Sequence, residues 1–573
     1  WAKLTHEQAA LYKAVLDDFL NEASKSEGMK RKGLILATLT KLKQICNHPA
    51  QFLSDGSAIA GRSGKLTRLE ELLVDILGSN QQLLVFTQYR EMGELLAEHL
   101  TGILGQQPPF LHGGVPRGKR DSMITSLQAG EGAPVLLVSL KAGGTGLNLT
   151  AANAGREYFQ ENLEKLDPYV IDARVKDDDA FLIEGNEAVA LGALYGGLTL
   201  LAWYPITPSS SIAESIIEWI PKLRLDKDGK STCAVVQAED EVAAAGMIIG
   251  GGWAGGRSMT ATSGPGVSLM SEFIGLSYFA EIPCVIWNVN RTGPSTGLPT
   301  RTQQGDLSMM YEASHGDTQH IVIIPGTVEE CFEFGWRAFD YAEQFQTIVF
   351  GFSDLDLGMN KWKATNLEYP TEKMNRGKVI HTQKQLDAIA NFGRYRDVDG
   401  DGIPYRTLPG SGLEPILYRG TGHDEDGVYS EDPEVYKNMM IRLRKKIDST
   451  RTILPQPLFR EEPEQDVGII YYGSMETTIQ EIDDILEDTG MKVSQCRVRS
   501  LPLSPAVEQF VVNHRLVIVL EINRDGQMYG IFRKELPIEL VPKVYSVAYS
   551  DGLPPRANVY AEKILEKIKE VTK

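Results

Sequence analysis

A chain of 573 residues, 42% hydrophobic and 23% charged, is too long for one hydrophobic core and too apolar for disorder. Its net charge of −18 is uneven, because residues 1–153 are almost neutral and the remainder carries the excess of acid, so we expect two parts of different origin. Five scattered cysteines without a Cys-x-x-Cys pair exclude a disulfide framework and a cysteine-ligated metal on this sequence. Because the first residues contain no apolar signal core, we expect a cytoplasmic protein.

The first 153 residues alternate apolar strands with amphipathic helices, as in a parallel α/β lobe. The successive strings are SGKLTRLEELLVDIL, QLLVFTQYREMGELLAEHL, FLHGG and APVLLVSLKAGGTGLNLTAAN. In this order they resemble the second helicase-type lobe of Swi/Snf-type DNA translocases. The phosphate-binding loop Gly-x4-Gly-Lys-Ser/Thr is absent, because Gly64 and Lys65 lack its spacing and hydroxyl and are predicted to begin a helix. The arginine-bearing motif of that family is also missing after Asn153, so we expect no ATPase activity.

From Asp179 onward, strands and helices alternate again, and polar residues follow the strands. Residues 188–204 are apolar but interrupted by glycine, so they are predicted as a buried helix and strand rather than a membrane span. Glu239, residues 262–264 and residues 290–291 each follow a predicted strand. Because the carboxyl ends of parallel strands form one crevice, we predict a ligand site there, with ordinary exposed loops as the alternative.

Six strings in this part are similar to the alpha subunit of 2-oxoacid:ferredoxin oxidoreductases. They are YPITPSS, VVQAEDE, TSGPG, NRTGPSTGLPT, SDLDLGMN and GHDEDGVYSEDPE, in the order of that family. The resemblance implies a multidomain α/β fold, with a pyrimidine-type thiamine-diphosphate-binding parallel domain and a transketolase C-terminal-like domain. The implied parts are a helicase-lobe-like α/β segment in the place of a gamma domain (1–153), a linker resembling a gamma-domain tail (154–178), the thiamine diphosphate domain (179–375), a connecting segment (376–464) and the transketolase C-terminal-like domain (465–573).

The resemblance also implies roles for single residues. Glu239 matches the catalytic acid that hydrogen-bonds N1′ of the thiamine aminopyrimidine, for which a carboxyl tuned by burial is suitable. Thr207 and Arg291 match the pair that holds the carboxylate of the 2-oxoacid, where arginine supplies a charge-assisted contact. The implied cofactor contacts are Pro205, Ile206, Glu239, Ser263 and Gly264.

The implied reaction is the oxidative decarboxylation of a 2-oxoacid to an acyl-CoA, with coenzyme A as co-substrate and ferredoxin as electron acceptor. A 2-oxoglutarate:ferredoxin oxidoreductase (2-oxoglutarate synthase) comes first, and pyruvate or branched 2-oxoacids stay open as alternatives. The resemblance implies thiamine diphosphate shared with a beta subunit that holds Mg²⁺ and a 4Fe-4S cluster, in an (alpha-beta)2 assembly without a membrane or nucleic acid. A nucleic-acid-binding translocase fragment with a passenger domain is the alternative from another class.

Two further motifs invite a metal or catalytic interpretation. Residues 397–402 resemble a calcium loop, but the twelfth position is Leu408 where a bidentate Glu is required, so we predict a turn and no metal ligand on this chain. The same stretch contains Gly-Asp-Gly, the opening of a magnesium motif, but no Asn-Asn follows at the usual distance. His423 is predicted to be structural or substrate-orienting.

Overall fold

The computed structural model describes residues 3–23, 38, 41–78, 82–87, 89–112, 115, 117–128, 132–139, 180–413, 418–460 and 466–572. The chain forms two compact units, Trp1–Arg174 and Val175–Lys573, and each is described by itself. The predicted linker 154–178 and the GGTGLN string, residues 143–148, lie outside the described residues. Within the described ranges, no helix is both long and apolar enough to cross a membrane.

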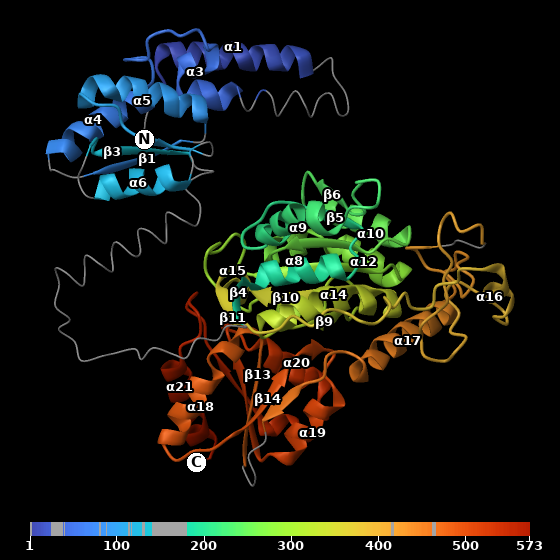
Figure 1. Ribbon diagram of the computed structural model, residues 1–573. Helices are drawn as coiled ribbons and strands as arrows, with labels where there is room; N and C mark the ends of the chain where they lie inside the picture. The colour runs from blue at the N-terminus through green and yellow to red at the C-terminus, as the bar shows by residue number, and fades with distance from the viewer. Residues whose placement is uncertain are drawn as a thin grey trace. The chain divides into compact units, whose positions relative to one another are not determined.

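The first unit contains a three-stranded parallel sheet in the order β1-β3-β2 (Figure 1). Its elements are α1 (His6–Ala23), α3 (Pro49–Leu53), α4 (Gly64–Gly78), β1 (Leu83–Thr87), α5 (Arg90–Leu104), β2 (Phe110–Leu111), α6 (Arg117–Gln128) and β3 (Val135–Ser139). Met92, Leu96 and Leu100 recur at helical spacing on α5 and are buried with Val135 and Leu137 of β3. The helix predicted to begin at Gly64 is confirmed.

The second unit opens with a sheet of seven strands in the order β15-β9-β10-β8-β7-β5-β6, parallel except for β15. The elements of this domain are β4 (Phe181–Glu184), α8 (Gly185–Tyr195), β5 (Leu200–Trp203), α9 (Ser210–Leu223), β6 (Ala234–Gln237), α10 (Glu241–Trp253), β7 (Ser258–Thr262), α11 (Gly264–Leu269), α12 (Ser271–Ala280), β8 (Cys284–Asn290), α13 (Leu307–Tyr311), β9 (Ile321–Ile323), α14 (Val328–Phe345), β10 (Ile348–Asp354), α15 (Leu355–Met359) and β11 (Lys361–Ala364). β4 and β11 form a separate antiparallel pair.

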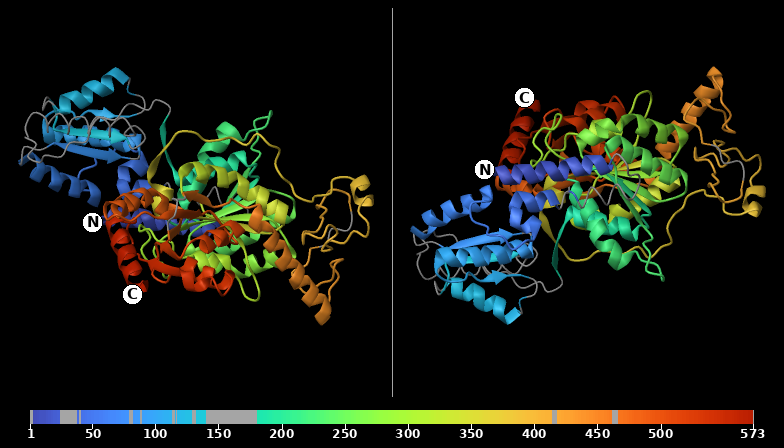
Figure 2. Two further views of the ribbon diagram at one scale, coloured as in Figure 1. Left: turned by 90° about the horizontal axis from the view of Figure 1, so that it is seen from below. Right: turned by 90° about the horizontal axis from the view of Figure 1, so that it is seen from above.

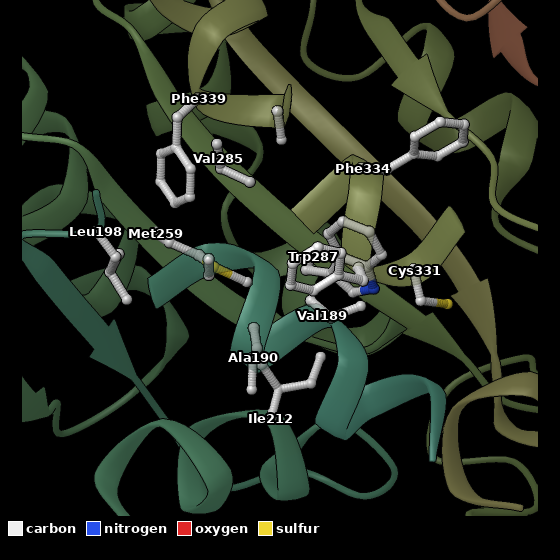
Figure 3. Close-up of a cluster of buried hydrophobic side chains, with 14 of the residues drawn as sticks. Val189, Ala190, Leu198, Ile212, Met259, Val285, Trp287, Cys331, Phe334 and Phe339 are labelled. Carbon is white, nitrogen blue, oxygen red and sulfur yellow. The ribbon is translucent and has the colours of Figure 1, made fainter. Parts of the chain in front are cut away.

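Helices cover both faces of the seven-stranded sheet. Alternate residues of a strand face opposite layers, so Trp287 of β8 packs with α8, α9 and α14, whereas Ile286 packs with α10 and α12. Figure 3 shows Trp287 beside Val189 of α8 in the first of these cores. Gly192 lets α8 and α14 approach closely, because a Cβ there would overlap the carbonyl oxygen of Phe332. The two faces of the sheet are therefore buried by apolar helix layers, and only the ends of the strands can bind a ligand.

The C-terminal domain is a second α/β layer structure with a five-stranded sheet in the order β12-β14-β13-β16-β17. Its elements are β12 (Leu458–Arg460), β13 (Val467–Tyr472), η2 (Gly473–Thr477), α18 (Ile479–Asp488), β14 (Ser494–Val498), β15 (Ser500–Leu501), α19 (Pro505–Asn513), β16 (Leu516–Glu521), α20 (Gln527–Glu535), η3 (Val541–Lys543), β17 (Val544–Ala548) and α21 (Ala557–Val571). β15 leaves this domain and pairs with β9 of the first sheet, with Ser500 opposite Ile323.

The connecting segment contains α16 (Gln383–Asp387), α17 (Pro433–Ser449) and η1 (Thr450–Thr452). In both views of Figure 2, as in Figure 1, the part around α16 stands to one side of the two sheets. α17 is attached through Glu281, a fully buried carboxylate after α12 that contacts Lys446 Nζ at 2.7 Å and Arg442 Nη1 at 3.1 Å. Although burial raises it, these two cations lower the pKa of Glu281 to about 2.

Candidate active site

The carboxyl ends of the parallel strands meet at one edge of the first sheet. β5 lies between β6 and β7. The chain runs from β5 to β6 on one side and from β7 to β8 on the other, so the loops that follow β5 and β7 lead away from each other. Open α/β sheets bind ligands at such a point. The predicted residues all lie just after strands at this edge, after β5 (Pro205, Ile206, Thr207), β6 (Glu239), β7 (Ser263 and Gly264, the first residue of α11) and β8 (Arg291).

Arg291 and Thr207 lie in contact, as the predicted carboxylate-binding pair requires. Arg291 is 7% exposed, and its Nη1 donates a hydrogen bond to the backbone oxygen of Thr207 at 2.7 Å. Its Nε has no hydrogen-bond partner among the described residues. Burial lowers the pKa of Arg291 while Asp306 and Glu241 act against that change, and a guanidinium stays charged at neutral pH. The site therefore holds a buried cation with an unused donor.

Glu239 lies just beyond β6, which is the edge strand of the sheet. Trp203 pairs with Gln237, so Glu239 and Pro205 each stand two residues past the paired ends of neighbouring strands. Both side chains are exposed, and Ile206 is half-buried. The burial expected for the Glu239 carboxyl is not found among the described residues, in which no strand pairs with the outer edge of β6. A second surface would be needed to bury it.

Ser263 and Gly264 are buried where β7 passes into α11. Ser263 occupies the N-cap position of α11 without capping it, and its Oγ has no partner in the described part of the chain. Gly264 lies against Asp306, because a Cβ on this glycine would come within 2.7 Å of both carboxylate oxygens. The close approach of Asp306 thus requires a residue without a side chain at this position.

Within the second unit, a cleft of about 790 Å³ runs between the domain of the seven-stranded sheet and the C-terminal domain. Gly264, Arg291 and Asp306 line its first wall, and Arg524 and Asp551 are among the residues of the opposite wall. Thr207 reaches it through its bond to Arg291, whereas the other predicted residues do not line it. The predicted carboxylate-binding residue Arg291 therefore shares this cleft with Asp306, Arg524 and Asp551, which were not predicted as site residues.

Asp306, which is half-buried, and Glu241, which is buried, are two carboxylates at this edge that the sequence did not point out. Glu241 is 7% exposed and acts electrostatically on Arg291. Burial raises the pKa of Asp306 to about 6, although Asn288 and Arg291 favour its ionised form. Both residues stand at helix starts, where acidic residues are common, so their sequence pattern alone carries no functional signal.

The calcium-loop-like residues 397–402 and His423 both have structural contacts that explain them. The carboxylates of Asp399 and Asp401 contact Lys378 Nζ at 2.7 and 2.8 Å, so an ammonium group lies between them. His423 is buried, its Nδ1 lies 2.8 Å from the oxygen of Thr421, and its ring is 3.9 Å from that of Tyr395. Neither finding points to catalysis on this chain.

The residues of this edge fit one part of a thiamine diphosphate site. Glu239 offers a free carboxyl, Ser263 an unpartnered hydroxyl and Ile206 an apolar surface, which suits an uncharged aminopyrimidine ring. Among the described residues, no group of three His, Cys, Asp or Glu side chains could hold a metal ion. The fold and the site together define an α/β protein of the thiamine-diphosphate type.

Comparison with known proteins identifies the family. Residues 191–393 match the pyruvate flavodoxin/ferredoxin oxidoreductase, thiamine diphosphate-binding family, and residues 64–158 match the helicase conserved C-terminal domain. The chain is 32% identical over 407 residues to 2-oxoacid:ferredoxin oxidoreductase 2, subunit alpha, of Aeropyrum pernix, which covers 69% of this chain and 62% of that relative. It is 33% identical over 374 residues to 2-oxoglutarate synthase subunit KorA of Methanothermobacter thermautotrophicus, covering 64% of this chain and 94% of that relative.

A solved structure agrees with these relatives. The 2-oxoglutarate:ferredoxin oxidoreductase from Magnetococcus marinus, with 2-oxoglutarate, coenzyme A and succinyl-CoA bound, is 27% identical. It superposes with a TM-score of 0.66 over 84% of this chain and 78% of that one. The chain belongs to the family of 2-oxoacid:ferredoxin oxidoreductase alpha subunits. The predicted fold class and both predicted resemblances, the helicase-like one included, are confirmed.

Proposed function

We propose that this chain is the alpha subunit of a 2-oxoglutarate:ferredoxin oxidoreductase, which converts a 2-oxoacid to an acyl-CoA while ferredoxin is reduced. The observation that carries this proposal is the buried guanidinium of Arg291, bound to Thr207 and left with an unpartnered Nε. A pyruvate or branched 2-oxoacid oxidoreductase subunit is the alternative, since Arg291 would hold the carboxylate that all these substrates share.

In the proposed reaction, one set of residues binds the substrate and a second set binds the aminopyrimidine ring of the cofactor. Arg291 and Thr207 bind and orient the substrate carboxylate, with its charge balanced by the guanidinium. Glu239 holds a proton at N1′ of the aminopyrimidine, with Pro205, Ile206, Ser263 and Gly264 around that ring. Bound thiamine diphosphate supplies the carbon that receives the 2-oxo group and the path for its electrons.

A beta subunit belongs to the same proposal. The exposed side of β6 leaves Glu239 uncovered, and the described residues provide no metal-binding cluster, so we assign Mg²⁺, the diphosphate contacts and the 4Fe-4S cluster to the partner. An (alpha-beta)2 assembly in the cytoplasm, with ferredoxin and coenzyme A as further partners, completes it.

The test is reconstitution with the beta subunit of a family member. Reduction of ferredoxin or a viologen dye should require the beta subunit, coenzyme A and a 2-oxoacid, and 2-oxoglutarate should give a higher kcat/KM than pyruvate or a branched 2-oxoacid. The purified chain alone should show no activity. Reduction by the isolated chain would refute the need for a partner, and no activity in any well-assembled complex would refute the proposed function.

A further inference from the structure

Asp306 is a half-buried carboxylate on the cleft wall that occupies a helix N-cap without capping the helix. Aspartate at the start of a helix normally accepts hydrogen bonds from the first backbone N–H groups, but Asp306 makes no such bond to α13. Its Oδ2 instead accepts a hydrogen bond from Asn288 Nδ2 at 3.0 Å, and its backbone N–H donates to Asn290 Oδ1 at 3.1 Å. The carboxylate is therefore turned from its own helix toward the end of β8 and the cleft.

The C-terminal domain fixes the loop that carries Asp306. The Gln527 side chain donates from Nε2 to the oxygen of Gly305 at 2.6 Å and accepts at Oε1 from the N–H of Ser308 at 3.0 Å. The backbone N–H of Gln304 also donates to the oxygen of Ile522 at 2.7 Å. Because the loop is held on both sides of Asp306, its carboxylate cannot move far from the cleft wall.

The charges around Asp306 come from several elements. Arg291, after β8, acts on it directly, and Glu241 of α10 acts on Arg291. Arg524 and Asp525, across the cleft before α20, pair with each other at 2.6 Å, and Asp551, after β17, pairs with Arg556 at 2.7 Å. No ion pair within 4 Å joins Asp306 to any of the described cations. Arg291 is thus the one cation of the first wall that acts on both Asp306 and an incoming carboxylate.

We propose, on the basis of the proposed function, that Asp306 is a positioning residue that couples binding of the substrate carboxylate at Arg291 to uptake of one proton. A carboxylate that docks on Arg291 brings a second negative charge to a largely desolvated cleft wall that already contains the Asp306 carboxylate. Like charges in such a place cannot both stay ionised without a large cost. A proton from solvent therefore moves onto Asp306 as the substrate binds and returns to solvent as it leaves.

The sign of the pH dependence follows from burial, which raises the pKa of Asp306 to about 6. Below that pH Asp306 is already protonated, and binding takes up no proton. Above it, binding requires proton uptake, so KM for the 2-oxoacid should rise by up to about tenfold per pH unit. The substrate carboxylates titrate well below this range and do not contribute.

The test compares the parent alpha/beta complex with two variants between pH 5 and 8. Asp306→Asn keeps an acceptor for Asn288 but cannot ionise, so its KM should lose the rise with pH. Asn288→Leu removes the donor that favours the ionised form, so the rise should begin at a higher pH. Thermal unfolding of each complex checks that the fold is retained.

Calorimetry supplies a readout that does not depend on turnover. Binding of 2-hydroxyglutarate, an unreactive analogue with the same carboxylates, is measured at pH 7 in two buffers of different ionisation enthalpy. The parent complex should take up close to one proton and the Asp306→Asn complex close to none. Equal proton uptake by both, or equal slopes of KM against pH, would overturn the inference even in an active enzyme. A complex without 2-oxoacid-dependent dye reduction would instead refute the proposed function, and the calorimetric result would still decide the role of Asp306.

Discussion

Glu239 and Arg291 differ in burial, and they should fail in different ways when they are changed. Glu239→Gln removes a proton donor, so exchange of the C2 proton of thiamine diphosphate in the reconstituted complex should slow by about 10²–10⁴-fold without any substrate present. Arg291→Ala removes a buried charge-assisted partner and should weaken the binding of 2-oxoacids by about 2–5 kcal/mol. Proton exchange followed by NMR and KM measured by dye reduction separate the two effects.

Each variant provides the control for the other. Arg291→Ala should exchange the C2 proton at nearly the parent rate, and Glu239→Gln should keep nearly the parent affinity for an unreactive substrate analogue. If both variants exchange the proton at the parent rate, the role of Glu239 is wrong while the family assignment stands.

Gly264 is required by the carboxylate beside it. In Gly264→Ala the new Cβ would lie 2.7 Å from both oxygens of Asp306, which is closer than atoms pack, so we expect a loss of about 1–3 kcal/mol of unfolding free energy. Gly250→Ala is a matched control, because Gly250 is exposed on α10 and nothing lies within 4 Å of its added Cβ. Urea denaturation of the two variants checks the difference, and equal stabilities would contradict the contact.

The candidate site could be predicted only in part from the sequence. The residues at the ends of β5 to β8 could be found, because a strand followed by polar residues is a local pattern and the family resemblance assigns roles to them. Asp306 could not be found, because Gly-Asp-Leu before a short helix has the pattern of an ordinary capping aspartate. Its place on the cleft wall is set by the bond from Asn288 to its carboxylate and by the bonds of the distant Gln527 to the neighbouring backbone of Gly305 and Ser308, which no local pattern contains.

Among the elements, α17 is held by an apolar contact with α12 and by one carboxylate, Glu281. Glu281→Gln would leave the largely buried Arg442 and the fully buried Lys446 in contact with a neutral group, so the unfolding free energy should fall by about 3–5 kcal/mol at pH 7. Glu434→Gln is the control on the same helix, since its pair with Lys437 is exposed and worth less than about 1 kcal/mol. Chemical denaturation at pH 7 distinguishes the two variants.

The effect of Glu281 should disappear in acid. Its pKa is lowered to about 2 in the folded chain from an ordinary 4.5, so its stabilising contribution is complete above about pH 4.5 and is lost as the pH falls through 2. The difference between the parent and Glu281→Gln should therefore shrink across this interval. A difference that stays constant from pH 5 to pH 2 would contradict the ion pair.

The alternation of strands and helices could be predicted because buried parallel strands form nearly continuous apolar runs, such as Cys284–Asn290 in β8. β15 could not be predicted. It has two residues, and its partner β9 lies in another domain, so its only signal is tertiary pairing. β12 likewise lies in the predicted connecting segment but pairs with β14 of the C-terminal sheet.

At the scale of the whole chain, the helicase-like first unit should contribute no ATP-driven activity. The sequence contains no Gly-x4-Gly-Lys-Ser/Thr loop, which a nucleotide requires for its phosphates and magnesium. ATP hydrolysis by the chain, with or without double-stranded DNA, should stay at the buffer rate in a phosphate-release assay. Turnover that is abolished by changing Gly144 or Thr145, which lie outside the described residues, would contradict this expectation.

β15 has a consequence for the order in which the chain can fold during synthesis. The outer edge of β9 presents unpaired backbone groups until Ser500 and Leu501 have been made, and an open strand edge is a template for pairing with other chains. Although N-terminal domains generally fold first on the ribosome, this sheet cannot be completed until the C-terminal domain has emerged as far as Ser500 and Leu501. The nascent chain therefore carries an open edge at β9 while the residues between β9 and β15 are made, and during that part of synthesis the edge is open to pairing with other chains.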